Sequence, residues 1–308
     1  MSQTGHRFDL TWQALRDEGF AQTATQVTQV QNWLVDYFSS SPTSGSKDEL
    51  SKLHFDNLSS VEQINNYWQN FTVNTRNAIQ QATREGDALK FLSILGMSLH
   101  AVQDFYAHST WVETHTPYDE TFRTDTWFDN LPTQGMELYT GYYPDDDDSR
   151  FTPRPHGDDT YGVNHDSPFR PGWNQSYVFS YAAYRQWVNA VQTWASEINP
   201  QFWEQVKSYE LTNDTDRVGL NFDLVATYRL SEWLGKWKGA GSGSIDDLIP
   251  FAFAWTAAPD SIFVRQFKEN HLYNLLTPNL SADGKIISPR PDFSSSLVPT
   301  NRFLDSRA

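Results

Sequence analysis

The sequence predicts an all-α protein, a multi-helix bundle with a long irregular excursion and an irregular C-terminal extension. Three observations predict it. Apolar residues recur every three or four positions through most of the first 235 residues. Clusters of glycine, serine and proline separate these segments and are typical of helix ends and loops. Aromatic residues make up 15% of the 308 residues, which favours a large core over long disordered regions.

The first helical segments are punctuated by glycines. Residues 7–38 carry an apolar stripe that breaks near Gly19. Residues 59–84 are predicted to form one or two helices, with an N-cap at the serine of position 59 or 60 and a stop at Gly86. A turn-rich loop, SSSPTSGS at 39–46, separates the two segments.

Three longer segments complete the predicted bundle. Residues 87–113 read as one long apolar helix with Asp87 as its cap. Residues 175–208 return to helix with a dense aromatic pattern, and residues 216–237 form a further helix.

Two stretches lack helical periodicity. Residues 114–173 hold seven prolines and a run of four aspartates, which predicts a long excursion of the kind that forms lids or binding loops. After a flexible GAGSGS joint the tail mixes short apolar pieces with prolines. We therefore divide the chain into a helical metal-binding domain, 1–238, and an extension packed on it, 239–308.

Charge and cysteine content exclude several function classes. There are 23 Lys+Arg against 38 Asp+Glu, so the net charge is −15 with histidine neutral. Such a chain is repelled by bulk nucleic acid and by anionic membranes. The absence of cysteine excludes disulfides, thiolate metal sites and a cysteine nucleophile, so any metal is held by His, Asp or Glu. No signal peptide or transmembrane stretch is visible, which predicts a cytoplasmic protein or non-classical export.

The most informative motif is a histidine and aspartate series in the long apolar helix. His100, Asp104 and His108 follow one another at intervals of four. Eight residues drift only about 80° around a helix, so the three side chains share one face. His100 and Asp104 are close enough to share a divalent cation. His108 lies about 12 Å along the axis from His100, which favours a neighbouring metal.

This motif also carries a family resemblance. The stretch LGMSLHAVQDFYAHSTWVE at 95–113 resembles the signature of the Het-C family, which is related to zinc-dependent phospholipases C and more distantly to single-strand-specific fungal nucleases. Residues 31–37 (QNWLVDY) and 53–57 (LHFDN) are similar to further pieces of these families, and 229–244 is similar more weakly. The resemblance covers roughly residues 5–245.

The resemblance implies a cleft holding two or three divalent ions, zinc first, with calcium or another divalent ion as alternatives. The first metal would be held by Asp36, His54, His100 and Asp104. Asp104 would bridge to a second metal shared with His6, and His108 would begin a third site. The relatives use an N-terminal Trp amine and a later His-x-x-x-Glu pair that this chain lacks. His165 with Asp166, or His115 with Asp119, are candidate substitutes.

The function implied is metal-dependent hydrolysis of a phosphoester, of phospholipase C type. Clustered ions would activate a water, with Asp36 and Asp104 as the candidate catalytic carboxylates. A phospholipid or another phosphoester would be the substrate, and the excursion at 114–173 would make peripheral contact with the membrane.

Two alternatives stay open. One is a non-catalytic, metal-stabilised protein of Het-C type that acts in recognition, as in heterokaryon incompatibility, or in cell death through partners or membranes; the incomplete third site favours it. The other is a nuclease, which the charge of −15 disfavours.

Overall fold

The computed structural model describes these residues: 10–40, 53–55, 58–114, 138–141, 172–225, 261–268 and 272–278. Within them nearly all regular structure is helical, and the sheet-like pairing consists of an isolated antiparallel bridge between Ser109 and Thr140. The all-α prediction is confirmed for this part of the chain.

The first two helices meet at a glycine turn, as predicted. α1 spans Leu10–Asp17 and α2 spans Gln22–Ser40. Gly19 between them has a φ of 83°, in the left-handed region where a side chain is strained. The chain can therefore reverse here, and α1 packs against α2.

α4 is one uninterrupted helix, Val61–Glu85, whose ends follow the capping rules. The Ser60 side chain accepts a hydrogen bond from the backbone N–H of Gln63 at 3.3 Å. At the other end Gly86 has a φ of 68°, and its N–H bonds back to the last turn. Both predicted boundaries are confirmed.

α5 spans Ala88–Ala107 and is shorter than the helix predicted from periodicity. Asp87 caps its start, as predicted, by accepting a hydrogen bond from the backbone N–H of Lys90 at 2.9 Å. α5 ends with His108 as its C-cap, and beyond it the chain pairs with residues 139–140: the Thr110 N–H donates to the Tyr139 carbonyl, beside the bridge between Ser109 and Thr140. The rest of the predicted helix is the separate short α6, Trp111–Thr114.

The second half of the described chain is also helical. α7 spans Trp173–Ser196 and α8 spans Phe202–Lys207, so the predicted helix over 175–208 is broken in two around Pro200. Residues 214–225 form a further helix. α11, Ile262–Lys268, and the 3₁₀ turn η2, Leu272–Leu275, lie within the predicted extension, and α11 packs on α2 and α5. The proposed boundary at 238/239 lies outside the described residues.

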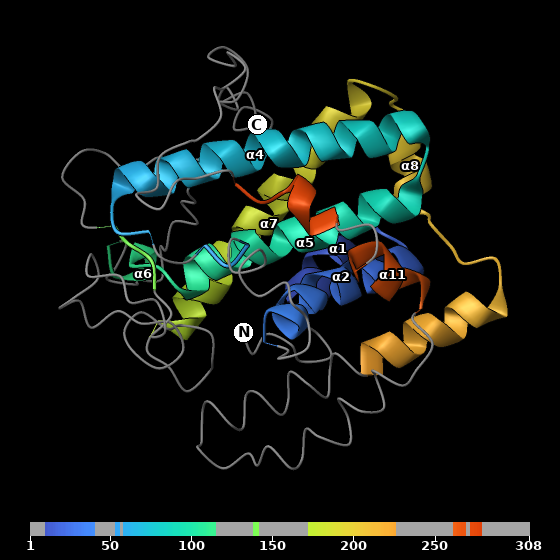
Figure 1. The fold of residues 1–308 in the computed structure, drawn as a ribbon, viewed down its shortest axis with the longest axis horizontal. Helices are drawn as coiled ribbons and strands as arrows, with labels where there is room; N and C mark the ends of the chain where they lie inside the picture. The colour runs from blue at the N-terminus through green and yellow to red at the C-terminus, as the bar shows by residue number, and fades with distance from the viewer. Residues whose placement is uncertain are drawn as a thin grey trace, which may run out of the picture.

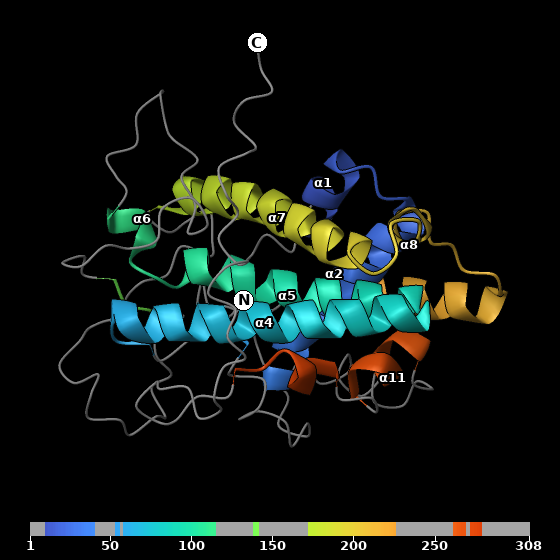
Figure 2. The same ribbon diagram turned by 90° about the horizontal axis from the view of Figure 1, so that it is seen from above.

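α5 is the central helix of the fold. Its side chains are buried all round, as expected of a helix enclosed by others. Figures 1 and 2 show α4 and α7 running along it, and α2, α8 and α11 also pack on it. Aromatic rings fill the spaces between these helices; for example, Trp187 of α7 stacks on Phe71 of α4 at 5.5 Å between ring centroids. Groups on α5 are therefore surrounded by packed side chains.

Among the described helices, none combines the length and hydropathy that spanning a bilayer requires.

Candidate metal centre

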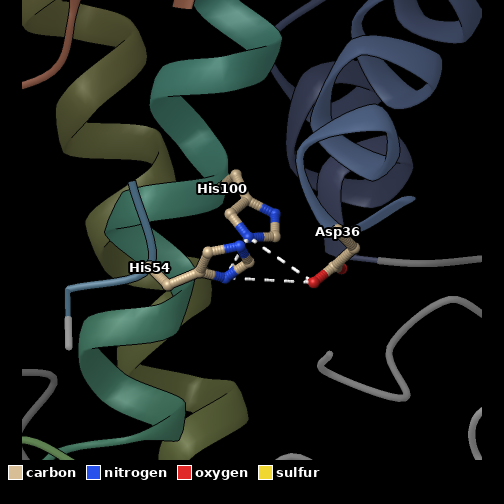
Figure 3. A group of neighbouring side chains, drawn as sticks. All are labelled: Asp36, His54 and His100. Atoms are coloured by element: carbon tan, nitrogen blue, oxygen red, sulfur yellow. Dashed lines mark hydrogen bonds and ion pairs between the residues drawn. The ribbon is translucent and has the colours of Figure 1, made fainter. Parts of the chain in front are cut away.

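Three side chains from three separate elements converge at one point. Asp36 lies near the end of α2, His54 in the turn at 53–55, and His100 in α5. One ligand atom from each lies within 4.8 Å of the others. Figure 3 shows the two imidazoles and the carboxylate pointing toward one another from their three backbones.

Asp104, one turn after His100, joins the same group. Its Oδ2 lies 2.8 Å from His54 Nδ1 and 3.0 Å from His100 Nε2. These two nitrogens are 3.2 Å apart, and their rings meet edge to face. Asp36 Oδ1 stands farther off, 4.0 Å from His54 Nδ1 and 3.8 Å from His100 Nε2.

These separations fit the edges of a tetrahedral metal site. With ligand bonds of about 2.0–2.2 Å, tetrahedral ligand atoms lie roughly 3.3–3.6 Å apart. Five of the six edges of such a shell are given above; they run from 2.8 to 4.0 Å and bracket that value, and the three residues whose ligand atoms all lie within 4.8 Å of one another are Asp36, His54 and His100. Small rotations of the side chains would equalise them around a central ion.

The burial of the four side chains also fits a cation. Asp36, His54, His100 and Asp104 are exposed by 7%, 4%, 2% and 1%. His54 Nε2 and Asp104 Oδ1 are buried without a hydrogen-bond partner. Two buried carboxylates are costly unless they are paired with positive charge. A divalent ion with two neutral imidazoles and two carboxylates would leave the site with no net charge.

The pKa shifts of the site without an ion also show that its carboxylates require nearby positive charge. Burial alone would lower the pKa of His100, but the neighbouring Asp104 and Asp36 carboxylates outweigh it and raise that pKa above its ordinary value. Burial opposes the charged form of Asp104 too, yet His100 and hydrogen bonds from both imidazoles hold its pKa well below the usual range. A proton on His100 therefore supplies part of the positive charge that the carboxylates require.

The spacing of α2 and α5 is set by a glycine beside the site. A Cβ placed on Gly96 would stand 2.4 Å from the carbonyl oxygen of Thr28 and 2.8 Å from Gln31 Cβ. Only glycine lets the two backbones approach so closely. Asp36 and His100 lie about one to two turns further along these helices, so this close contact brings their side chains within reach of one ion.

A chain of buried hydrogen bonds ties a third helix to this region. Asn32 of α2 donates to the Tyr184 hydroxyl at 3.1 Å, and Tyr184 donates to Gln103 Oε1 at 2.8 Å. Asn32 is one turn before Asp36, and Gln103 directly precedes Asp104. The helical spacing signalled that these polar residues share faces with the ligands, but only the fold shows that Tyr184 of α7 joins them.

His54 differs from the other three because it lies in a turn. The next residue, Phe55, has a φ of 58°, which is unusual for a bulky residue, and it is almost fully buried. Its ring packs 4.0 Å from Tyr67 and 5.1 Å from Phe105, between ring centroids. No pattern in the sequence signals this conformation, because it is imposed by the surrounding rings.

Of the remaining predicted ligands, His108 lies within the described residues, and it is not in the group of three. It is buried and is the C-cap of α5, where its backbone N–H donates to the Asp104 carbonyl, and the neighbouring metal predicted for it stays a prediction. His6, His165 and the alternative His115 lie outside the described residues. The ligand roles of all seven predicted positions stay predictions.

Comparison with known proteins points to a different family from the one the motif suggested. Residues 17–141 match the family model of the VWA7 N-terminal domain, a stretch that holds Asp36, His54, His100 and Asp104. No curated protein and no solved structure matches the chain.

The Het-C resemblance is therefore wrong, and the hydrolase, phospholipase and heterokaryon-incompatibility terms that followed from it are withdrawn. The physical reason is that histidine and aspartate one turn apart on an apolar helix form a short pattern. Any helix that contributes to a buried metal site can carry it, so it indicates a chemistry more strongly than a family. The chain is similar to the VWA7 N-terminal domain over less than half its length.

Proposed function

We propose that this chain is a metal-binding helical protein that holds one divalent transition-metal ion, zinc being the best fit. The four ligands are Asp36, His54, His100 and Asp104. The observation that carries the proposal is the convergence of two imidazole nitrogens on one carboxylate oxygen, with spacings of 2.8 to 3.2 Å, in a buried setting.

The ligand chemistry favours zinc over the alkaline-earth ions. Calcium and magnesium select oxygen ligands, six or more for calcium and near-ideal octahedra for magnesium. Here two of the four donors are imidazole nitrogens, which suit zinc and neighbouring transition metals. The number of donors matches a tetrahedral shell. The described residues support one such site, whereas the family resemblance implied two or three ions.

The role that best fits this geometry is structural. In such sites all four positions are taken by the protein, whereas catalytic zinc keeps one position for water or substrate. The ion would join α2, the turn at 53–55 and α5, and so couple three elements that are distant in sequence. This favours the non-catalytic alternative. In that case the bound ion would stabilise the fold, and recognition by partners would depend on the folded, metal-bound form.

Metal titration of the purified full-length chain tests the proposal. After chelation and dialysis, zinc is added against a chromophoric competitor, and bound zinc is counted by elemental analysis. We expect one tightly bound zinc per chain. His100→Ala should lose it, because the remaining donors no longer surround the ion.

His108→Ala is the matched control, because His108 is also a buried histidine at the end of α5. It should keep one zinc per chain. A wild-type chain that binds no zinc, or an H100A variant that binds it as tightly as wild type, contradicts the proposal. If H108A loses zinc as completely as H100A, the ligand set is wrong.

A further inference from the structure

We propose that Thr140 is a positioning residue for this metal site, acting through Leu58 to fix the turn that presents His54. The inference rests on the proposed metal binding and adds a residue that touches no ligand.

The first step is that His54 needs support that the other ligands receive from their helices. Asp36, His100 and Asp104 lie on α2 and α5, whose backbone hydrogen bonds hold them in place. His54 lies in a turn at 53–55 and not within one of the described helices. A bulky residue in the left-handed region, like Phe55, persists only where its surroundings over-determine it.

The second step is that rings support the turn on one side. Phe55 is 1% exposed and packs against Tyr67 and Trp68 of α4 and Phe105 of α5. These contacts fix the direction of the ring, but apolar packing alone tolerates small rotations and slides. A directional hydrogen bond on the C-terminal side of the turn adds a restraint on the backbone that this packing does not supply.

Thr140 supplies that contact. Its backbone N–H donates to the Leu58 carbonyl at 2.9 Å, and its side-chain oxygen accepts from the Leu58 N–H at 3.0 Å. Thr140 is 1% exposed and Leu58 is 5% exposed, so water does not replace these bonds. The N–H and the carbonyl of Leu58, four residues after His54, are thus both hydrogen-bonded to Thr140.

The third step connects Thr140 to the helix that carries two of the ligands. The Gly141 N–H donates to the His108 carbonyl at 2.7 Å, and the Thr110 N–H donates to Tyr139 at 3.0 Å. The segment 138–141 is therefore clamped to the end of α5; Figure 1 shows it in green beside α6 and the start of α4. It sets the position of the His54 turn relative to His100 and Asp104.

The test uses Co²⁺ as a spectroscopic substitute for zinc in the full-length chain. Thr140→Val keeps the shape but removes the acceptor for the Leu58 N–H. We expect cobalt binding to weaken roughly tenfold, the lower end of the range for loss of a group bonded directly to a metal ligand, because Thr140 acts through Leu58. The visible ligand-field spectrum should also change, because the angle of one imidazole changes. Thr140→Ser keeps the acceptor and should restore both affinity and spectrum.

Thr83→Val is the control for simple loss of a buried hydroxyl. Thr83 is 3% exposed, and its hydroxyl bonds within its own helix. It lies near the C-terminal end of α4, about 30 Å along the helix from the first turn. It should lower stability while leaving the cobalt spectrum and affinity unchanged.

The outcomes separate the two proposals. If wild type gives no bound-cobalt spectrum, the metal site itself is refuted. If wild type binds and Thr140→Val binds with the same affinity and spectrum, the positioning role is refuted while the metal site stands. If Thr140→Val does not fold, Thr140→Ala replaces it, and unchanged cobalt binding in that variant also refutes the role.

Discussion

Asp104 is the residue on which the two imidazoles converge. Its Oδ2 contacts a nitrogen of each, while its Oδ1 is buried without a hydrogen-bond partner. A carboxylate in this position balances half of the charge of a divalent ion and orients both rings. It is thus the most sensitive single position in the site.

Asp104→Asn tests that sensitivity. The amide has nearly the same shape but carries no charge and offers a weaker donor to the metal. We expect zinc affinity to fall at least about a hundredfold, the upper end of what an outer-shell loss costs, measured by competition with a chromophoric chelator.

Asp223→Asn is the control at this scale. Asp223 is another buried aspartate, bonded to Ser261 in a different part of the fold. Its variant should bind zinc as wild type does. Equal zinc affinity in D104N and wild type would remove Asp104 from the ligand set.

At the scale of elements, the closest approach of α2 and α5 determines whether Asp36 and His100 can share an ion. The contact at Gly96 admits no side chain, because a Cβ there would collide with the backbone oxygen of Thr28. Backbone cannot move aside as a flexible side chain can, so the helices themselves would have to separate.

Gly96→Ala should therefore destabilise the fold and weaken metal binding together. Overpacking of this kind costs about 1–3 kcal/mol, measured as the change in the free energy of unfolding in urea. Separation of the helices should also draw the Asp36 carboxylate away from the imidazoles, which lowers zinc affinity.

Gly219→Ala makes the same change in the helix at 214–225. There the new Cβ would meet Ser261 Cβ at 3.2 Å, a contact that a shift of a few tenths of an ångström between the two segments relieves. Alanine is the better helix former by about 1 kcal/mol, so stability should hold or rise and zinc affinity should not change. A Gly96→Ala variant that behaves like Gly219→Ala would show that the close contact is not needed.

At the scale of the whole molecule, the site lies where α5, the central helix, meets its neighbours. An ion that binds only the folded state stabilises it by mass action, about 4 kcal/mol at a thousandfold excess over the dissociation constant. The ligands come from three separated elements. A bound ion should therefore raise the free energy of unfolding of the whole helical domain and not only that of one element.

Chelation at pH 8 should therefore lower the thermal midpoint by on the order of 10 °C, measured by circular dichroism with and without zinc. The difference should shrink toward pH 6. Protons compete with the metal for the imidazoles, and the pKa of His100 without metal is raised above its ordinary value.

The pH dependence of the stability of the metal-free protein also predicts a smaller chelation effect at pH 6. A raised pKa of His100 gives stability that is present below about 6.5 and is lost as pH rises through the folded value. The lowered pKa of Asp104 acts only at lower pH, where the carboxylate becomes protonated. A chelation effect that is equal at pH 6 and pH 8 would argue against imidazole ligands.

The sequence alone determined the helices and their caps, because these depend on local chemistry. Ser60, Gly86 and Asp87 lie where their side chains or backbones satisfy the ends of α4 and α5. Helical spacing also placed His100 and Asp104 on one face, one turn apart. It overextended α5, because the pairing of Thr110 with Tyr139 beyond the end of the helix joins residues distant in sequence.

Only the tertiary structure decided which of the candidate ligands meet. Asp36, His54 and His100 are separated by loops and helices, and their distances depend on the contact at Gly96 and on the strained turn at Phe55. Such distances arise from packing of the whole core, in which many weak contacts act together, and no local pattern encodes them. For the same reason a short motif indicated metal chemistry but suggested the wrong family.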